Sequence, residues 1–297
     1  MYHSPVMVAA SMEGLMIRPG GLYVDATFGG GGHARAILER LADGRLFAFD
    51  QDRAALANVP DDGRIVFLNQ NFRYMMNFLK FYGALPVDGI LADLGVSSHQ
   101  FDLAQRGFSI RADGPLDMRM DTTGGLTAAD LVNDYDAARL AELFRGYGDL
   151  PAARRIAAHI DRRRKLGRIA TTGQLVNILA ELAPRGRENK FMAKVFQALR
   201  IEVNQEVEAL KELLLQGTEA LTPGGRMVII SYHSLEDRLV KNFFRAGNFS
   251  GEVEKDFFGH AVKPLTAIGK LRVPDEEEVA GNPRARSARM RIAEKNS

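Results

Sequence analysis

The stretch LYVDATFGGGGH, residues 22–33, decides how the rest of the chain is interpreted. Its apolar start, residues 22–24, predicts a buried strand that ends in Asp25, and the residues from Ala34 onward predict the start of a helix. Between them lie four consecutive glycines, each of which costs about 0.5–1 kcal/mol relative to alanine in a regular element. A chain keeps such residues where the backbone adopts positive φ or a ligand approaches closely. This order of strand, glycine-rich turn and helix start is typical of a nucleotide or cofactor site.

Two acids flank this loop and narrow the kind of ligand. Asp25 precedes the loop, and a second predicted strand, residues 46–49, ends in Asp50. A carboxylate at the end of the second strand can accept hydrogen bonds from two ribose hydroxyls. The spacing of residues 29–34 also fits the loose dinucleotide fingerprint. The acid before the loop favours S-adenosylmethionine over NAD, and a glycine turn without a ligand is the remaining alternative.

The composition is that of a globular protein without cysteine chemistry. The 297 residues are 46% hydrophobic and 26% charged, and the absence of cysteine excludes disulfides and thiolate metal ligands. Because the chain has no cysteine and only six histidines, it offers few of the residues that bind zinc, and we expect no metal site. No apolar run reaches the roughly 18 residues of a membrane span, and the first residues lack a signal-peptide pattern. We therefore expect a cytoplasmic protein that does not associate with a membrane.

The positive charge is concentrated in one segment. Residues 151–200 contain twelve Lys and Arg against three Asp and Glu, a local charge of +9, whereas the whole chain carries +2. This asymmetry favours a polyanionic partner such as nucleic acid, although a solvated helical face is the alternative. The densest basic tract is formed by Arg154, Arg155, Arg162, Arg163, Arg164, Lys165 and Arg168.

The order of predicted elements indicates a sheet domain with an insertion. Up to residue 95, strands and helices alternate with short turns, which predicts a parallel, doubly wound sheet whose ligands bind at the carboxyl ends of the strands. Residues 96–121 have no clear periodicity and are interpreted as an ordered functional loop. From residue 126 to 216 the spacing predicts helices only, among them one long helix over 191–215.

Strand and helix patterns return after this helical segment. Residues 227–231 predict a further strand, Ser234 is a candidate N-cap of the next helix, and residues 287–294 predict a last strand. Residues 246–283 are expected to be mostly irregular. We expect residues 1–107 and 217–297 to form the sheet domain and residues 108–216 to form an inserted all-helical, substrate-recognition domain.

Longer strings of the sequence resemble known methyltransferases. The acid-x-x-x-Gly-x-Gly loop, the acids ending predicted strands two and four, and the Pro-Gly-Gly turn before strand five resemble class I S-adenosylmethionine-dependent methyltransferases. The closer resemblance, nearly end to end, is to the ribosomal RNA small subunit methyltransferase H family. It is carried by HSPVM (3–7), DATFGGGGH (25–33), DLGVSSHQFD (93–102), RGFS (106–109), DGPLDMRMD (113–121), FQALRIEVNQE (196–206), SYHSLEDRLVK (231–241) and NPRARSARMRIAEK (282–295).

The resemblance implies a fold, a reaction and a set of binding residues. The fold is a class I, Rossmann-like α/β methyltransferase domain with the inserted helical domain. The enzyme is an rRNA (cytosine-N4)-methyltransferase that uses S-adenosyl-L-methionine to methylate the exocyclic N4 amine of a specific cytidine in the decoding region of 16S rRNA, in the small ribosomal subunit. The implied cofactor-binding residues are Gly31, Gly32, His33, Asp50, Phe72, Asp93 and Gln100.

Asp93 is the expected catalytic residue. The exocyclic amine of cytosine is a poor nucleophile because its lone pair is delocalised into the ring, so the enzyme must accept hydrogen bonds from it and orient it. Amine methyltransferases that resemble this chain place an Asp or Asn at this strand end, followed by an aromatic residue that is missing from residues 93–96 here. The base-stacking residue is left open among Phe101, Phe108 and Tyr232, and second-tier candidates for base or phosphate contacts are His233 and Ser234.

Two other functions stay open on the sequence. One is an NAD-dependent oxidoreductase, which Asp25 and the basic insertion disfavour; the other is a non-catalytic RNA-binding or assembly factor, which the strand-end acids disfavour. The oligomeric state is also open, with a homodimer as one option. Whether naked RNA or the assembled subunit is the substrate is a further open point.

Overall fold

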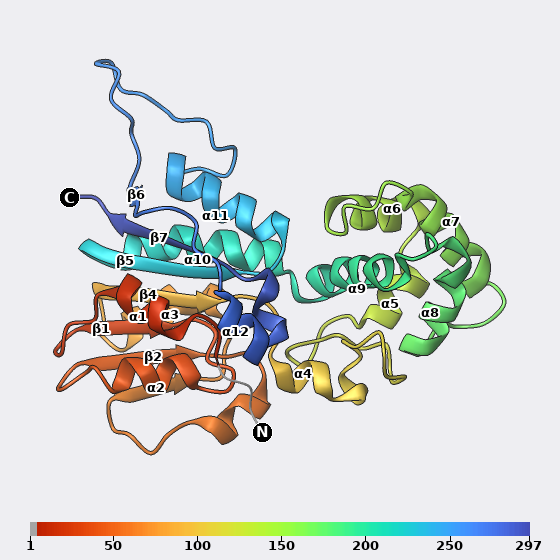
Figure 1. Cartoon of the computed structure of the whole chain (residues 1–297), viewed down its shortest axis with the longest axis horizontal. Helices are drawn as coiled ribbons and strands as arrows, with labels where there is room; N and C mark the ends of the chain where they lie inside the picture. Colours follow the sequence, from red (N-terminus) through yellow and green to blue (C-terminus); the bar gives the residue numbers. More distant parts are fainter. Residues whose placement is uncertain (1–4) are drawn as a thin grey trace. The chain divides into compact units, whose positions relative to one another are not determined.

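The chain forms two compact units, each with its own core. A computed structural model describes residues 5–297, so His3 and Ser4 of the HSPVM string lie outside the described residues. One unit comprises the residues up to Gly95 together with Val207–Ser297, and the other comprises Val96–Glu206 (Figure 1). These junctions differ from those expected after residues 107 and 216 by about ten residues at each end.

One seven-stranded sheet forms the core of the first unit. The strand order is β3-β2-β1-β4-β5-β7-β6, with β1 to β5 paired in parallel and β7 antiparallel to both β5 and β6. This is the order of a dinucleotide-binding sheet with an antiparallel strand inserted between its fifth and sixth strands. The expected doubly wound α/β sheet is confirmed. The strands are β1 (Leu22–Asp25), β2 (Arg45–Phe49), β3 (Ile65–Leu68), β4 (Val87–Asp93), β5 (Leu221–Ser231), β6 (Leu265–Ala267) and β7 (Arg289–Lys295).

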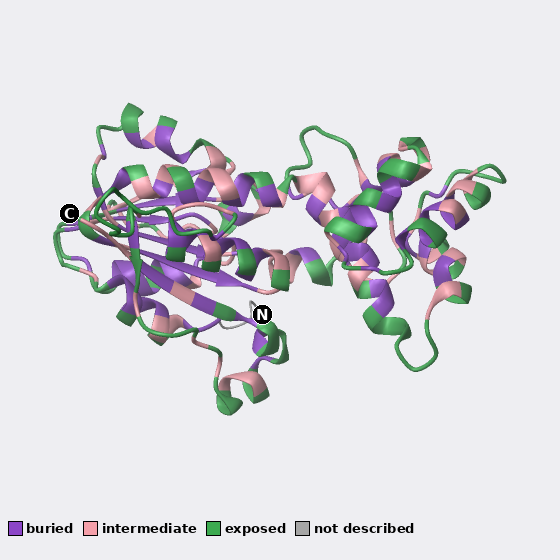
Figure 2. Cartoon of the chain, turned by 90° about the horizontal axis from the view of Figure 1, so that it is seen from above, coloured by how far each residue is buried: buried purple, intermediate pink, exposed green. Residues whose placement is uncertain are grey.

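Alternate residues of the strands pack against helices on the two faces of the sheet. Val228 and Ile230 of β5 belong to a hydrophobic core that also contains side chains of α1 and α2. Met227 points to the opposite face, where a Cβ added to Gly217 of α10 would lie 2.4 Å from the Met227 Cε atom. Figure 2 shows the result, buried strands enclosed by helices whose outer sides are exposed.

The helices of the sheet unit occupy the connections that the sequence predicts, with two differences. The N-cap of α11 is His233 and not Ser234, because the His233 ring accepts the N–H of Glu236. Residues 246–283 contain β6 and α12 in addition to irregular chain. The helices are α1 (Val8–Leu15), α2 (Gly32–Leu38), α3 (Met75–Phe81), α10 (Glu206–Ala220), α11 (Ser234–Ala246) and α12 (Glu276–Gly281), with 3-10 turns η1 (Arg53–Asn58), η2 (Phe72–Tyr74) and η5 (Pro283–Ser287).

The second unit is helical, and the loop before its first long helix belongs to its core. Phe108, Leu116 and Met118 are at most 4% exposed and pack with the helices, which explains why this unit begins before residue 108. Thr127 and Asp130 form a capping box at the start of the helix that follows this loop. The helices are α4 (Ser98–Asp102), α5 (Ala128–Asp134), α6 (Ala137–Gly146), α7 (Ala153–Arg164), α8 (Thr172–Leu179) and α9 (Glu188–Asn204), with 3-10 turns η3 (Ala104–Arg106) and η4 (Ala180–Leu182).

The expectation of a single long helix over residues 191–215 is wrong. The chain breaks at Gln205, whose φ of 50° places it in the left-handed region and separates α9 from α10. The side chain of Asn204 is engaged with the preceding loop, since its Nδ2 donates to the carbonyl of Met118 (2.8 Å) and its Oδ1 accepts from the N–H of Met120 (2.7 Å). The apolar period continues through the break, which is why the sequence pattern does not reveal it.

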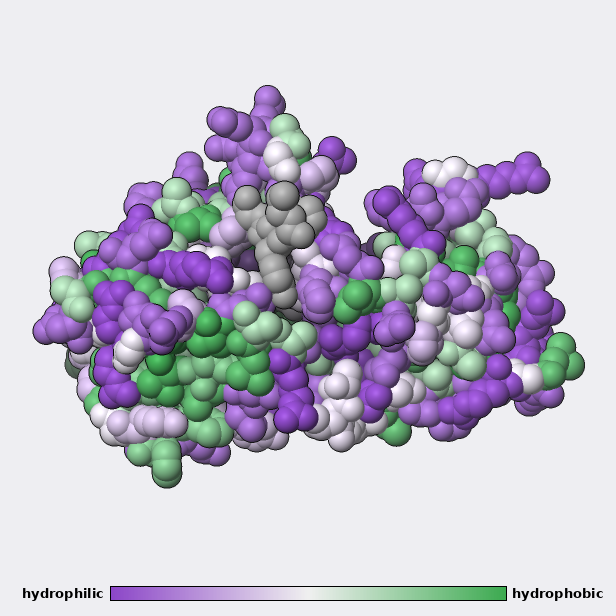
Figure 3. Space-filling model, turned by 90° about the horizontal axis from the view of Figure 1, so that it is seen from below, coloured by the Kyte–Doolittle hydropathy of each residue, from purple (hydrophilic) through white to green (hydrophobic). Residues whose placement is uncertain are grey.

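Within residues 5–297, no helix is long and apolar enough to cross a membrane. Figure 3 shows one face of the molecule, on which hydrophilic residues surround smaller hydrophobic areas. The surface of each unit therefore mixes charged and apolar side chains, as is usual for globular proteins.

Candidate cofactor and active site

Three carboxylates lie at the carboxyl ends of neighbouring strands in the sheet unit. Asp25 ends β1, Asp50 follows β2, and Asp93 ends β4, and these three strands are adjacent in the sheet. Their charges act on one another, because both Asp93 and Asp50 raise the pKa of Asp25. The sheet thus concentrates negative potential at the edge where doubly wound folds bind ligands.

Asp25 is the most deeply buried of these acids. Burial raises its pKa to about 6, against the opposing effects of His33 and of the hydrogen bond from the Thr27 N–H. That N–H donates to Oδ1 at 3.1 Å, whereas Oδ2 is buried and accepts no hydrogen bond from any described residue. A buried carboxylate oxygen without a donor fits a cationic ligand better than a pyrophosphate.

The glycine loop is fastened to the end of β2. The Phe28 N–H donates to the carbonyl of Phe49 (2.9 Å), and the next N–H, that of Gly29, donates to Oδ2 of Asp50 (2.7 Å). The other carboxylate oxygen of Asp50 accepts from the N–H of Asp52 at 2.8 Å. The Asp50 residue is partly exposed, and a carboxylate oxygen can accept more than one hydrogen bond, so binding of ribose hydroxyls here stays a prediction.

The glycines of the loop have different roles. A Cβ at Gly29 would have no neighbour closer than 3.9 Å, so this residue borders open space. A Cβ at Gly31 would lie 2.8 Å from the Phe28 ring, and one at Gly32 would lie 2.4 Å from Pro5. Close packing against protein atoms therefore accounts for Gly31 and Gly32, and contacts from their backbone to a cofactor stay a prediction.

His33 is a buried and neutral member of this region. Burial lowers its pKa, with Asp25 and the contact to Val6 acting in the opposite direction. Its Nε2 lies 2.9 Å from the carbonyl oxygen of Val6. Because a carbonyl oxygen can only accept, the ring proton is on Nε2, and Nδ1 carries no proton. The bare Nδ1 lies 3.9 Å from Oδ2 of Asp93.

Phe72 is held near Asp50 by two asparagines. The Nδ2 of Asn69 donates to the backbone carbonyl of Asp50 (2.8 Å), and Asn71 donates from its Nδ2 to Gln51 (2.9 Å). Asn71 also caps the turn that begins with Phe72. Phe72 is partly exposed, and an aromatic ring at this position suits contact with the face of an adenine; its role in cofactor binding stays a prediction.

Asp93 accepts a hydrogen bond from Tyr232, a residue that the sequence suggests only for base stacking. Tyr232, considered as a base-stacking group, donates from its hydroxyl to Oδ1 of Asp93 at 2.7 Å. Burial raises the pKa of Asp93 to about 7, although this hydrogen bond lowers it. The sequence places Tyr232 directly after β5 and Asp93 at the end of β4, so both are expected at the carboxyl edge of the sheet. It does not predict the contact of the Tyr232 hydroxyl with Asp93, because that contact depends on the register of the two strands.

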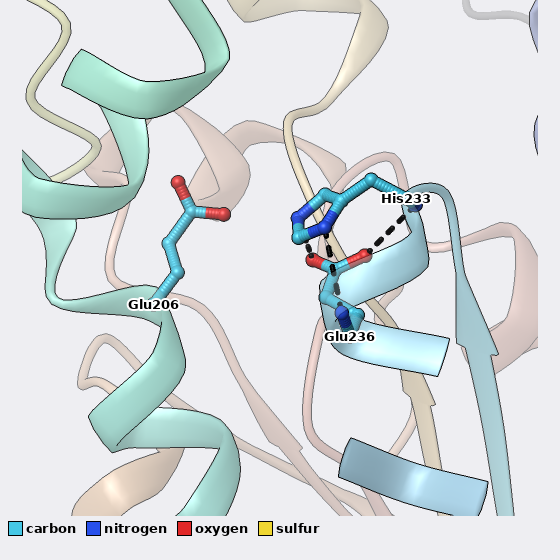
Figure 4. A group of neighbouring side chains, drawn as sticks. All are labelled: Glu206, His233 and Glu236. Atoms are coloured by element: carbon cyan, nitrogen blue, oxygen red, sulfur yellow. Dashed lines mark hydrogen bonds and ion pairs between the residues drawn. The ribbon is translucent and has the colours of Figure 1, made fainter. Parts of the chain in front are cut away.

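His233, a candidate for base or phosphate contacts on the sequence, has a structural role as the N-cap of α11. Its Nδ1 accepts the N–H of Glu236 at 3.4 Å, and its Nε2 lies 3.0 Å from the Glu236 carboxylate (Figure 4). The same carboxylate accepts the N–H of Tyr232 at 3.0 Å. Glu206, also drawn, is the first residue of α10 and pairs with Arg200 at 2.8 Å.

The remaining predicted site residues lie in the helical unit. Gln100 is in α4, where its side chain accepts the N–H of Ser97 as part of a capping box. Phe101 is 39% exposed, but Phe108 is only 4% exposed and belongs to the helical core. Its burial removes Phe108 from the base-stacking candidates.

The basic tract divides into a structural and an exposed part. Arg164 is mostly buried and donates to the carbonyls of Val132 (3.1 Å), Asn133 (2.9 Å) and Tyr135 (2.6 Å). Arg154, Arg155 and Arg163 are exposed, and no described residue forms an ion pair with them. The exposed arginines are the ones able to contact phosphates.

Comparison with known proteins gives one family. The MraW methylase family matches residues 1–296. The chain is 55% identical to ribosomal RNA small subunit methyltransferase H of Parabacteroides distasonis, covering 99% of this chain and 97% of the relative. Proteins of the same name from Phocaeicola vulgatus and Bacteroides thetaiotaomicron are 54% and 55% identical, again over 99% of this chain, with 98% and 97% of each relative covered. Together with a sheet whose carboxyl edge carries a glycine loop and three acids, these matches show that the chain belongs to the MraW methylase family.

Proposed function

We propose that this protein is an S-adenosylmethionine-dependent methyltransferase that methylates the exocyclic N4 amine of a specific cytidine in the decoding region of 16S rRNA. The observation that carries the proposal is Asp93, an acceptor at the end of β4, beside a glycine loop that is hydrogen-bonded to Asp50. The relatives' printed name, ribosomal RNA small subunit methyltransferase H, supports the same substrate. An rRNA substrate implies the cytoplasm as the place of action.

The residues at the sheet edge fit the cofactor. Asp50 would accept from the ribose hydroxyls, Phe72 would cover the adenine, and the loop from Gly31 to His33 would border the methionine part. Asp25 and Asp93 supply a negative potential that suits a sulfonium. Gln100, in the helical unit, is proposed as a further contact on the family resemblance. When bound, S-adenosylmethionine supplies a methyl group on a positively charged sulfur that becomes a neutral thioether.

Asp93 would prepare the amine for methyl transfer. Its Oδ2 would accept a hydrogen bond from the exocyclic N–H, which returns electron density to the nitrogen and orients it. As the nitrogen forms its bond to the methyl carbon, it loses one proton, and Asp93 is the acceptor within reach. The carboxylate can take this proton only in its ionised form, and burial raises its pKa to about 7.

The helical unit would bind the RNA. Arg154, Arg155 and Arg163 would contact phosphates, which provide affinity without reading the sequence. The target cytidine must leave its stack to reach a methyl donor. We propose the small ribosomal subunit as the context, with a homodimer left as an option.

One experiment tests the reaction and its catalytic residue together. The protein is incubated with methyl-labelled S-adenosylmethionine and small ribosomal subunits that lack the modification, and the labelled base is mapped by digestion and mass spectrometry. We expect label on N4 of one cytidine, none with Asp93→Ala, and wild-type labelling with Asp61→Ala, an exposed control. Label on another base, or near-wild-type turnover of folded Asp93→Ala, would contradict the proposal.

A further inference from the structure

The hydroxyl of Tyr232 is directed at Asp93 by the pairing of two strands. β4 and β5 are parallel neighbours in which Asp93 pairs with Ile230, two residues before Tyr232. The Tyr232 backbone is fixed separately, since its N–H donates to the Glu236 carboxylate at 3.0 Å. The hydroxyl then reaches Oδ1 of Asp93 at 2.7 Å. Burial and the Asp93 charge raise the pKa of Tyr232 well above its ordinary value, so the phenol keeps its proton and acts as a donor.

The two oxygens of the Asp93 carboxylate have different surroundings. Oδ1 accepts from Tyr232, whereas no described residue donates to Oδ2. The nearest polar atom recorded near Oδ2 is the bare Nδ1 of His33 at 3.9 Å, which is itself an acceptor. The Asp93 backbone is held as well, because its N–H donates to the Thr27 hydroxyl at 2.6 Å. Oδ2 is thus the oxygen whose hydrogen-bonding capacity is left for a donor outside the protein.

We propose that Tyr232 is a positioning residue that binds Oδ1 of Asp93 and thereby leaves Oδ2 as the acceptor for the target amine. This inference rests on the proposed methyltransferase function and assigns a role that is different from base stacking. Tyr232 does not touch the substrate in this role. It fixes the carboxylate rotamer, and its hydrogen bond favours the ionised form that can accept from the amine.

The charged groups around Asp93 define what removal of the hydroxyl should do. Burial raises the pKa of Asp93, Glu236 and Glu278 raise it further, and the Tyr232 hydroxyl lowers it. His33, at 3.9 Å, is neutral, and Asp25 is the neighbouring acid on β1. Loss of the hydroxyl therefore moves the pKa of Asp93 upward, and the acid limb of the rate profile should follow.

The test compares Tyr232→Phe with Tyr82→Phe. Tyr82 is a matched control because it lies at the end of α3, is 40% exposed and contacts Phe47 and Phe81 through its ring. For Tyr232→Phe we expect kcat to fall about 10–100-fold with an unchanged KM for RNA, because a small misplacement of a reacting group has effects of this size. The midpoint of the acid limb of kcat/KM should rise by about one pH unit. Tyr82→Phe should match the wild type in all three quantities.

A second measurement does not depend on catalysis. In protein labelled with 13C at aspartate carboxyl carbons, the Asp93 resonance is assigned by its absence from Asp93→Asn and titrated without cofactor. We expect a midpoint near 7 in the wild type and a higher one in Tyr232→Phe. An unchanged Asp93 midpoint, or a loss of kcat with an unshifted acid limb, would overturn the positioning role. If the wild-type protein transferred no methyl group, but the Asp93 midpoint was still higher in Tyr232→Phe than in the wild type, only the proposed function would be contradicted.

Discussion

The N–H of Gly29 donates to Oδ2 of Asp50 over 2.7 Å and so joins the loop after β1 to the end of β2. The same carboxylate is held on its other oxygen by the N–H of Asp52. Two backbone donors fix its orientation before any ligand arrives. The residue proposed to bind ribose is therefore also the one that shapes the glycine loop.

Replacement of Asp50 should weaken cofactor binding more than it slows chemistry. Hydrogen bonds to a charged group contribute about 1.5–3 kcal/mol each, so we expect Asp50→Ala to raise the Kd for S-adenosylmethionine about 10–100-fold. Isothermal titration calorimetry measures this Kd, with Asp61→Ala as the control. A wild-type Kd for Asp50→Ala would exclude the ribose role.

Asp25 should make the cofactor-free protein less stable as the pH rises. Its pKa is about 6 in the folded protein, chiefly because of burial, and about 3.9 in an unfolded chain. Because the pKa is higher in the folded protein, Asp25 contributes fully to the free energy of unfolding only below about pH 4. This contribution is lost as the pH rises through 6, and the loss is about 3 kcal/mol at pH 8. We expect Asp25→Asn to flatten the dependence of unfolding free energy on pH between 4.5 and 8. Denaturant unfolding at several pH values measures this dependence. If the unfolding free energy of Asp25→Asn changed with pH as it does in the wild type, the raised pKa of Asp25 would be refuted.

Two glycines of the helical unit should respond differently to the same substitution. Gly107 and Gly125 both have positive φ, 74° and 81°, but a Cβ at Gly107 would lie 2.4 Å from the carbonyl oxygen of Pro115, whereas Gly125 faces open space. Backbone strain alone costs about 1 kcal/mol in Gly125→Ala, and the clash raises the cost to about 3 kcal/mol in Gly107→Ala. Unfolding free energies of the two variants test this, and equal costs would contradict it.

The two parts of the basic tract should separate RNA binding from stability. Arg154→Glu with Arg155→Glu should weaken RNA binding and reduce the slope of log Kd against log salt by about 2, with thermal stability unchanged. Arg164→Ala should lower stability instead, because three backbone carbonyls lose their donor. Filter binding at several salt concentrations and thermal unfolding distinguish these results. An unchanged salt slope for the double variant would count against the proposed RNA surface.

The sheet was predictable from sequence because its signals are local. Apolar runs that end in Asp25, Asp50 or Asp93 identify strands directly, and a strand followed by glycines and a helix has few alternatives. The break at Gln205 was not predictable, because a non-glycine residue in the left-handed region has no local signature and Asn204 is held by a distant loop. The bond between Tyr232 and Asp93 depends on strand register across an insertion of more than a hundred residues.

The late position of β7 in the chain has a consequence for how the protein folds during synthesis. β6 pairs only with β7 among the described strands, and β5 gains its second neighbour from the same strand, so both wait for residues 289–295. The helical unit, by contrast, is one continuous segment and makes its contacts at shorter sequence separation. It can leave the ribosome and fold while β4 still lacks β5, its second neighbour in the sheet. The sheet is completed last, when β7 pairs with β5 on one side and with β6 on the other.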